Sequence, residues 1–144
     1  MSKKSYRQAI NEAIRQEMER DPAVLCFGLD VDDPKAIQGT TRGLAERFGP
    51  ERVFGTPLAE DAMTGVAIGM ALAGLRPVVE MRVIDFALCA MDEIVNQAAK
   101  NRFMFGGQGR VPLVARLPIG IWSASAAQHS QSLEAWFAHL PGVA

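Results

Sequence analysis

The sequence predicts an α/β fold in which helices cover both faces of a parallel sheet, giving three layers. Strand-like apolar runs alternate with helical patterns along the chain, and short turns rich in glycine and proline join them. Such alternation favours a parallel sheet, because parallel strands need crossover connections and helices usually supply them. The chain has 144 residues, the usual size of one domain, so we expect residues 1–144 to fold as a single domain.

The first third of the chain predicts a helix, a buried strand, a loop and a second helix. Residues 5–22 open on a capping-box pattern, continue with apolar residues spaced three and four apart, and end on a proline. Residues 24–28 form a short apolar run closed by glycine, which is typical of a strand buried on both faces. The acidic, proline-containing segment 30–39 predicts a loop. The next helix should run from residue 40 or 41 to residue 48, because the Gly-Pro pair after it cannot extend it.

The rest of the chain continues the alternation of strands and helices. A helix of small apolar residues should start near Glu60. The glycine-rich run 106–109 follows a helix and precedes a strand, which is the wrong order for a phosphate-binding loop, so it predicts a turn. The expected strands lie at residues 52–54, 77–81 and 111–115, and a longer helix is expected at residues 86–103.

Charge and hydropathy limit the kinds of partner. Fifteen basic and sixteen acidic residues give a net charge of -1 with no tail or patch of one sign, so neither nucleic acid nor an anionic membrane is an expected partner. The longest apolar stretch, residues 62–75, is far shorter than the roughly 20 residues that cross a bilayer. The charged N-terminal segment lacks a signal-peptide apolar block, so we expect a cytoplasmic protein. Cys26 and Cys89 are each flanked by apolar residues, which predicts buried, reduced thiols rather than a disulfide or a metal pair.

The predicted topology also indicates where a ligand would bind. In open parallel α/β sheets, the ligand crevice lies beyond the carboxyl ends of the strands. Glu60, Asp85, Phe86 and a polar run that contains His129 all fall at that edge. Glu60 heads an otherwise small and apolar helix, where little water can solvate its charge. A sheltered carboxylate suits acid–base chemistry, which makes Glu60 the first catalytic candidate.

Two further patterns leave alternatives open. Gly65, Gly69 and Ala73 recur at every fourth residue, so another backbone can approach one face of the helix closely. They indicate either internal packing of the helix on the sheet or a tight subunit interface. The apolar context of His139 predicts a packed helix end. His129, among small polar residues at the crevice, is either a site residue or an ordinary structural histidine.

Four segments carry a family resemblance: Thr56–Glu60, Ala67–Pro77, Asn96–Lys100 and Gln128–Ser132. They resemble the β subunit of the thiamine-diphosphate-dependent 2-oxo acid dehydrogenases, the E1 components for pyruvate, branched-chain 2-oxo acids and acetoin. The resemblance runs from about Ser5 to the last residue and covers only the pyrimidine-binding, transketolase-like domain. In the family the β subunit continues into a second α/β domain, which this chain is expected to lack.

The resemblance implies roles for four residues. The residue that matches Glu60 hydrogen-bonds N1′ of the cofactor's aminopyrimidine and favours the tautomer that removes the C2 proton of the thiazolium ring. Leu58 and Phe86 are implied to pack against the pyrimidine, Phe86 by aromatic stacking. His129 resembles a histidine near the reactive end of the cofactor that assists acyl transfer to the lipoyl arm of a lipoyl acyltransferase, E2.

The resemblance also implies a partner subunit. In the family the enzyme is an α₂β₂ heterotetramer, and the α subunit holds the diphosphate and its Mg²⁺ through a Gly-Asp-Gly motif with a downstream Asn. No Gly-Asp-Gly occurs in this sequence. The chain is therefore expected to form half of a site and to contribute no metal ligands.

The chain departs from the family pattern at four places. Leu29 stands where the family often has a glutamate of an acidic channel between two cofactors, which puts proton communication between sites in doubt. Segment 32–38 replaces a glycine-rich stretch. Arg82 replaces an apolar residue near the pyrimidine, and we expect it to point away or to pair with an acid such as Asp85. Ile119–Trp122 differs from a glycine-rich loop of the family, so its Trp should narrow the substrate entrance and influence substrate choice.

The leading hypothesis is the pyrimidine-binding part of an E1 that oxidatively decarboxylates a 2-oxo acid and passes the acyl group to lipoate. One alternative, which rests on Leu29, keeps the cofactor but not the lipoyl acceptor and acts as a carboligase or decarboxylase. Another is a non-catalytic assembly domain that keeps the fold and the small-residue interface. A flavodoxin-like nucleotide binder is disfavoured because the sequence has no phosphate-binding loop. The sequence does not specify the 2-oxo acid or acetoin, because groups of the α subunit largely contact the substrate in the family.

Overall fold

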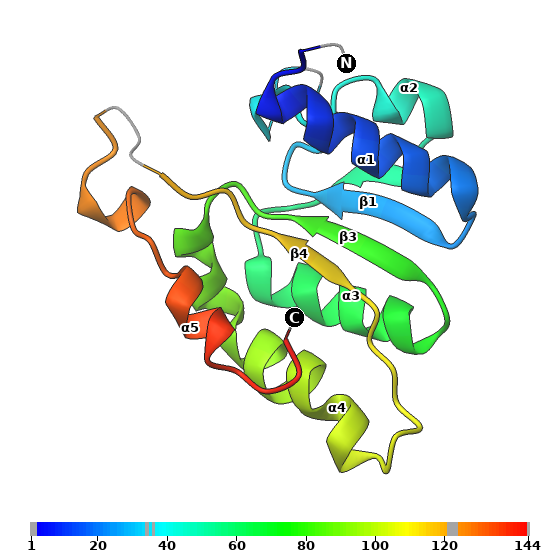
Figure 1. Cartoon of the computed structure of the whole chain (residues 1–144), viewed down its shortest axis with the longest axis vertical. Helices are drawn as coiled ribbons and strands as arrows, with labels where there is room; N and C mark the ends of the chain where they lie inside the picture. The colour runs from blue at the N-terminus through cyan, green and yellow to red at the C-terminus, as the bar shows by residue number, and fades with distance from the viewer. Residues whose placement is uncertain (1–2, 34, 36, 121–123, 144) are drawn as a thin grey trace.

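A computed structural model describes residues 3–33, 35, 37–120 and 124–143 of the chain. These residues contain a four-stranded sheet with the strand order β2-β1-β3-β4 (Figure 1). Every neighbouring pair of strands is parallel, as predicted. The crossover between β1 and β2 and the return to β3 place β1 and β3 at the centre of the sheet. The strands are β1 (Val24–Gly28), β2 (Val53–Gly55), β3 (Arg76–Glu80) and β4 (Val114–Arg116).

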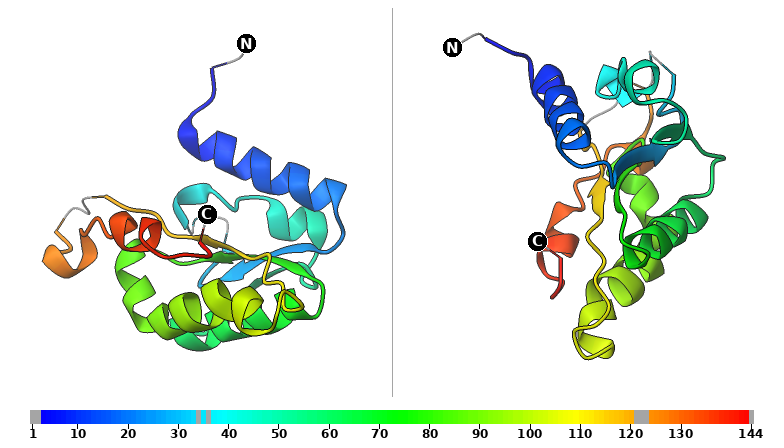
Figure 2. Two further views of the ribbon diagram at one scale, coloured as in Figure 1. Left: turned by 60° about the horizontal axis from the view of Figure 1, so that its bottom comes forward. Right: turned by 90° about the vertical axis from the view of Figure 1, so that its right-hand side faces the viewer.

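Helices cover both faces of this sheet, which confirms the predicted three layers. Figure 2 (left) shows α1 (Tyr6–Arg20) and α2 (Leu44–Phe48) on one side of the strands, in blue and cyan. The green and yellow-green helices α3 (Glu60–Leu72) and α4 (Ala99–Met104) lie on the other side. The shorter helical elements are η1 (Ile37–Gly39), η2 (Ile84–Ala90), η3 (Glu93–Ala98), η4 (Ala127–His129) and α5 (Glu134–Ala138).

The side chains of β1 alternate between two apolar clusters, one on each face of the sheet. Leu25 and Phe27 belong to the cluster under α3 and η2, whereas Val24 and Cys26 belong to the cluster under α1 and α2. All five residues of β1 are buried, as the continuous apolar run predicts for a central parallel strand. The sheet is therefore held by two cores, and its ends rather than its faces remain available for a ligand.

The predicted capping box at the start of α1 is present. The Ser5 hydroxyl accepts a hydrogen bond from the Gln8 backbone N–H at 3.2 Å, and the Gln8 side-chain oxygen accepts one from the Ser5 N–H at 2.8 Å. Both bonds satisfy N–H groups that have no partner inside the helix, a contribution of about 1 kcal/mol. The helix then ends at Arg20, just before the Asp-Pro pair, as expected.

Three elements begin more than one residue away from the predicted position, whereas β2 and β3 are shifted by one residue. The second helix begins at Leu44 rather than at residue 40 or 41, because Gly43 adopts a left-handed φ of 77° that separates the preceding turn from the helix. β4 begins at Val114 rather than at residue 111, since Pro112 has no N–H to donate to a ladder. The long helix expected at residues 86–103 begins earlier and passes from a 3₁₀ form in η2 through a π form in η3 to α4.

The structure also tests the predictions made for Cys26, Cys89 and His139. Both cysteines are free, and Cys26 is buried, where burial raises the pKa of its thiol. Cys89 is exposed, so the prediction of a buried thiol was wrong there: it lies on the outer side of η2. His139 is exposed at the end of α5 rather than packed. Residues 105–107 form the expected turn. Among the described residues, no helix is long and apolar enough to cross a membrane.

Candidate functional site

The carboxyl ends of the parallel strands lie at one edge of the sheet, on the left in Figure 1. The first turn of α3 begins at this edge, η2 follows β3 there, and the orange segment that contains η4 lies beyond η2. Residues separated by up to about half of the chain are thus brought to one region. This is the edge at which open α/β sheets bind ligands.

Glu60 is the first residue of α3 and is partly buried. Its backbone carbonyl accepts a hydrogen bond from the Thr64 hydroxyl at 2.7 Å, which fixes the first turn of the helix. Its carboxylate, by contrast, accepts no hydrogen bond and makes no ion pair with any residue that the structure describes. Two residues earlier, Leu58 has 67% of its surface exposed. The head of α3 therefore offers an unpaired carboxylate beside an exposed apolar side chain.

Phe86 and His129 are in direct ring contact, although 43 positions separate them in the sequence. Their ring centroids are 5.3 Å apart and the rings are nearly perpendicular, at 89°. Such edge-to-face contacts favour a defined ring orientation. The Nδ1 atom of His129 is buried and has no hydrogen-bond partner within the described residues. A buried polar atom without a partner is costly, so this nitrogen is suited to bind a group from outside the chain.

Asp85 has a positioning role that the sequence did not indicate. It is 6% exposed and accepts two hydrogen bonds from Gln131, at 3.2 Å from the backbone N–H and 2.8 Å from the side-chain amide. These bonds attach the segment that follows η4 to η2. They hold His129 against Phe86, so we assign Asp85 to the support of the site rather than to its chemistry.

Arg82 pairs with an acid, but not with Asp85. Its guanidinium lies 3.5 Å from the carboxylate of Asp30, and both side chains are about half exposed. The expectation that Arg82 pairs with an acid is therefore confirmed, with Asp30 as the partner. Asp30 adopts a left-handed φ of 55° directly after the half-buried Leu29. Asp30 is consequently engaged in an ion pair. It lies beside Leu29, the position at which the family described above often has a glutamate.

A buried ion pair lies directly behind the site and was not found by sequence analysis. Glu80, at the carboxyl end of β3, has no exposed surface and accepts hydrogen bonds from Arg116 Nε at 2.5 Å and 2.6 Å. The same guanidinium donates to the Thr40 hydroxyl at 2.6 Å. Burial raises the pKa of Glu80, and the attraction of Arg116 opposes that rise. The acidic residue within the otherwise apolar run 77–81 was the one sequence signal for this pair.

The backbone beside Glu80 leaves no room for a side chain on β1. Gly28 is paired in register with Glu80, and a Cβ atom at Gly28 would lie 2.2 Å from the Glu80 carbonyl oxygen. The strand can end here only with a glycine, because even a methyl group would collide with the neighbouring backbone. The close approach of the β1 and β3 backbones at Gly28 and Glu80 therefore defines the edge of the sheet at which the site lies.

The position of the small residues of α3 distinguishes between packing on the sheet and exposure at a possible subunit interface. Gly65, Gly69 and Ala73 are exposed, so they do not pack on the sheet and the internal-packing interpretation is wrong. A Cβ atom at Gly65 or Gly69 would meet no atom within 4 Å. Glycine in a helix lowers stability by about 0.5–1 kcal/mol relative to alanine, and nothing inside the chain requires it here. The exposed Val66 and Leu72 extend the same face with apolar side chains.

Two sequence predictions fall partly or wholly on residues that the structure does not describe. Residues 121–123, which include Trp122 of the loop expected to influence substrate choice, are outside the described residues. Pro34 and Ala36 of the segment 32–38 are outside them as well. Among the residues that are described, no three His, Cys, Asp or Glu side chains gather in a way that could hold a metal ion.

Comparison with known families decides the membership of the chain. Residues 2–144 match the family described as "Transketolase, pyrimidine binding domain". The chain belongs to this family.

Relatives of this pyrimidine-binding domain include β subunits of three named dehydrogenases or oxidoreductases. It is 47% identical to the pyruvate dehydrogenase E1 component subunit beta of Rickettsia bellii, over 96% of this chain and 43% of that protein. It is 46% identical to the acetoin:2,6-dichlorophenolindophenol oxidoreductase subunit beta of Cupriavidus necator, over 98% of this chain and 44% of that protein. It is also 46% identical to the 2-oxoisovalerate dehydrogenase subunit beta of Bacillus subtilis, over 99% and 44%. The chain therefore spans less than half of the length of these relatives.

A solved structure has the same fold. The "Split gene transketolase, inactive beta4 tetramer" superposes with a TM-score of 0.72 over 94% of this chain and 40% of that one, at 22% sequence identity. At this level of identity the likeness concerns the fold alone. It agrees with the observed four parallel strands and the helices on both faces.

Proposed function

We propose that this pyrimidine-binding domain belongs to the β component of a thiamine-diphosphate-dependent 2-oxo acid dehydrogenase E1. The named relatives support this proposal, because they are β subunits that act on pyruvate, acetoin or 2-oxoisovalerate. The observation that carries it is the unpaired carboxylate of Glu60 at the same sheet edge as the Phe86–His129 ring pair. An acid and apolar or aromatic side chains can hold and activate an aminopyrimidine, and an imidazole at the same edge can move a proton in a later step.

The residues at the edge fit the cofactor. Thiamine diphosphate, when bound, supplies the nucleophilic carbon that attacks the carbonyl of the substrate. Glu60 would hold a proton at N1′ of the pyrimidine, since its carboxylate has no partner within the described chain. Leu58, which is 67% exposed, and the partly buried Phe86 would pack on the ring. Apolar walls exclude water and strengthen the hydrogen bond that Glu60 makes.

His129 is proposed to act at the stage of acyl transfer. Its ring is held by Phe86, and the Asp85–Gln131 hydrogen bonds hold the segment behind it. The buried Nδ1 has no partner among the described residues. The imidazole would hold or deliver a proton near the reactive end of the cofactor as the acyl group passes to the lipoyl arm of E2.

An α subunit is proposed to complete the site. The helix that carries the exposed small-residue face begins at Glu60, so a chain that packs on this face and continues past the N-terminal end of α3 also reaches the head of the helix. Apolar faces of this kind are typical of the centre of a subunit interface. We infer that the partner α subunit covers it in an α₂β₂ heterotetramer and holds the diphosphate and Mg²⁺.

A second candidate is a thiamine-dependent carboligase or decarboxylase that lacks the lipoyl acceptor. It is favoured by the apolar Leu29 at the channel position, because the adjacent Asp30 is paired with Arg82 and is not available as a substitute acid. Both candidates share the role of Glu60 and differ only in the fate of the acyl group.

The proposal is tested by reconstitution with a candidate α subunit, followed by two activity assays. The chain alone should bind thiamine diphosphate weakly, because one side of the cofactor would face water, and the complex should bind it tightly. In the complex, His129→Ala should spare decarboxylation measured with an artificial electron acceptor and impair acylation of lipoyl E2. Equal losses in both assays would remove the proposed role of His129, and a complex that never acylates E2 would favour the carboligase.

A further inference from the structure

The backbone that leads to His129 adopts a conformation that is unusual for its residues. Ala126, directly before η4, has a φ of 59° and a ψ of -175°. L-residues rarely adopt this combination, which is found almost only at glycine. Ala124, two residues earlier, also has a positive φ, of 57°. The His129 segment, residues 124–131, is therefore strained at its start.

The turn of η4 within this segment is weakly held by its own contacts. None of its residues is buried. The His129 N–H donates to the Ala126 carbonyl at 3.4 Å, and the Ser130 N–H donates to the Ala127 carbonyl at 3.3 Å. Both distances exceed the usual range of about 2.7–3.2 Å for such bonds. A strained conformation persists only where its surroundings impose it, so the position of His129 depends on contacts with another part of the chain.

Those contacts come from η2. Phe86 contacts the imidazole through the nearly perpendicular ring pair, with 5.3 Å between the centroids. Its neighbour Asp85 accepts both hydrogen bonds of Gln131 on one carboxylate oxygen, Oδ1. Asp85 is buried and is thus a fixed anchor. The strain at Ala126 and the two contacts at the end of the His129 segment therefore oppose each other.

We propose that Ala126 is a positioning residue that keeps the hold on His129 weak, an inference that rests on the acyl-transfer role proposed for His129. The strain raises the free energy of the held conformation, in which the imidazole contacts Phe86. The His129 segment then also populates a released conformation, in which the backbone at Ala126 is relaxed. The rate of acyl transfer depends on the fraction of molecules in which His129 is held. Ala126 acts only through His129.

Ala126→Gly tests the proposal, because glycine adopts the observed φ and ψ without strain. In the purified chain, nuclear Overhauser effects between the ring protons of His129 and Phe86 report the held conformation. Ala126→Gly should strengthen these effects up to about twofold, and Ala126→Val should weaken them by a similar factor, because a β-branched residue is strongly disfavoured at positive φ. Ala127→Gly is the matched control, since it adds a glycine one position later, where φ is not positive, and it should not strengthen them.

A second pair of variants tests whether the strain and the hydrogen bonds act on the same equilibrium. Gln131→Ala removes the side-chain bond to Asp85 and should weaken the ring contact, and Ala126→Gly in the same chain should restore part of the loss. Asp85→Asn keeps an oxygen that can accept both bonds, so it should behave like the parent. Gln128→Ala removes an exposed amide with no partner among the described residues and should have no effect.

The complex with the α subunit connects the held conformation to the reaction. Ala126→Val should lower acylation of lipoyl E2 about tenfold and change decarboxylation with an artificial electron acceptor less than about twofold. Ala126→Gly should acylate E2 at least as fast as the parent. A residue that served only the fold would change both assays by the same factor, so this split is the decisive readout.

Three results would overturn the proposal. The first is a ring contact that is unchanged in both Ala126→Gly and Ala126→Val, in chains whose spectra show that they are folded. The second is an equal strengthening in Ala127→Gly, which would be a general effect of glycine. The third is an equal loss in the two assays for Ala126→Val. If the parent complex never acylates E2, the proposed function fails, and the ring contact, measured without cofactor or partner, still decides whether Ala126 positions His129.

Discussion

Glu60 and Glu80 both lie at the carboxyl end of the sheet, but the protein surrounds the two carboxylates very differently. Glu80 has no exposed surface and is held by Arg116 through two hydrogen bonds. Glu60 is partly buried and has no partner among the described residues. The carboxylate that is deepest in the fold is fully satisfied, and the one at the open edge is not.

This difference in surroundings indicates different roles: Glu80 supports the fold, and Glu60 is the candidate for chemistry. The buried pair joins β3 to β4, and through Thr40 it also joins the sheet to the loop before α2. It fixes the edge on which Phe86 and His129 are placed. Glu60 is free to bind something that comes from outside the chain, and the apolar face of α3 beside it is free to bind a protein surface. A pKa shift alone would have pointed to Glu80, which shows that a perturbed acid is not necessarily the reactive one.

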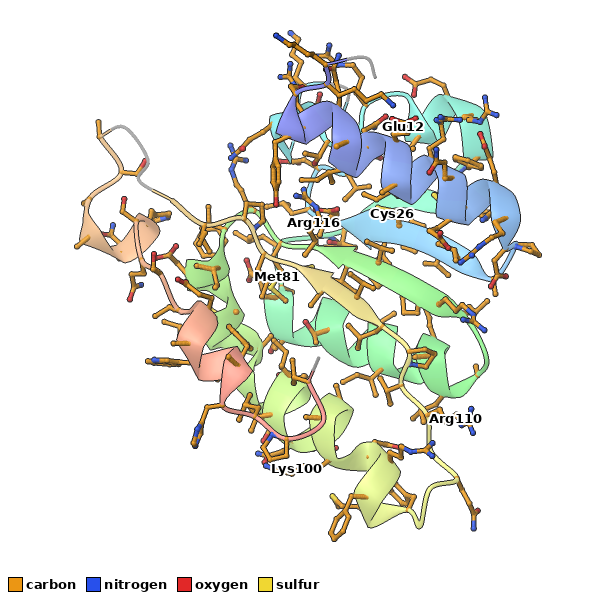
Figure 3. All side chains as sticks on the ribbon, in the orientation of Figure 1. Glu12, Cys26, Met81, Lys100, Arg110 and Arg116 are labelled. Carbon is orange, nitrogen blue, oxygen red and sulfur yellow. The ribbon has the colours of Figure 1, made fainter. Side chains whose placement is uncertain are left out.

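The largest expected effect is a loss of stability when the buried Glu80–Arg116 pair is broken. Arg116→Met should destabilise the chain by about 3–5 kcal/mol, because it leaves the charge of Glu80 buried without a partner. Urea unfolding followed by circular dichroism measures the change. Arg110→Met is the control, since Arg110 is exposed in the segment before β4 (Figure 3) and its loss should change stability by less than about 0.5 kcal/mol. A loss below about 1 kcal/mol for Arg116→Met would show that the pair does not support the edge.

The next largest expected effect is on binding of the α subunit to the exposed face of α3. Val66 is 51% exposed at the middle of the outer face of α3. Val66→Glu should leave the stability of the isolated chain nearly unchanged but weaken its binding to the α subunit roughly 30-fold or more, because it places an unpaired charge in an apolar interface. Ala13→Glu adds the same group to the exposed face of α1 and serves as the control. Calorimetric titration distinguishes the two, and equal affinities would place the interface elsewhere.

The smallest effect sharpens the argument about the glycines of α3. Gly65→Ala and Gly69→Ala should each stabilise the isolated chain by about 0.5–1 kcal/mol, because each new methyl group meets only open space. The same substitutions should weaken assembly with the α subunit, which needs the close approach that glycine allows. Thermal unfolding and sedimentation measure the two effects. A destabilised isolated chain would mean that the glycines serve the fold and not the interface.

The sequence predicted those parts of the fold that depend on neighbouring residues. The capping box of Ser5 and Gln8, the buried run of β1 and the turn after α4 are local patterns, and all three are present. The boundary of α2 was missed because it depends on the left-handed φ of Gly43, which composition does not show. Cys89 and His139 were misplaced for a related reason: apolar neighbours in sequence do not determine which side of a short helix faces the core.

The candidate site was predicted in part. Glu60, Phe86 and His129 were predicted to lie beyond the carboxyl ends of the strands, and they lie there, because the order of strands and helices determines which residues come directly after each strand. Their partners were not predicted. The Glu80–Arg116 pair and the Asp85–Gln131 bonds join residues 36 and 46 positions apart, and only the packed sheet brings them together.

The most direct test of the central claim is the exchange of the C2 proton of thiamine diphosphate with solvent deuterium, measured by NMR in the complex with the α subunit. Glu60→Gln keeps the shape of the side chain but removes its acid. The account predicts that this variant still binds the cofactor and that exchange slows at least about 100-fold, the usual contribution of a general acid or base. Exchange at the parental rate in Glu60→Gln, with cofactor bound, would contradict the assignment of Glu60 as the activating group.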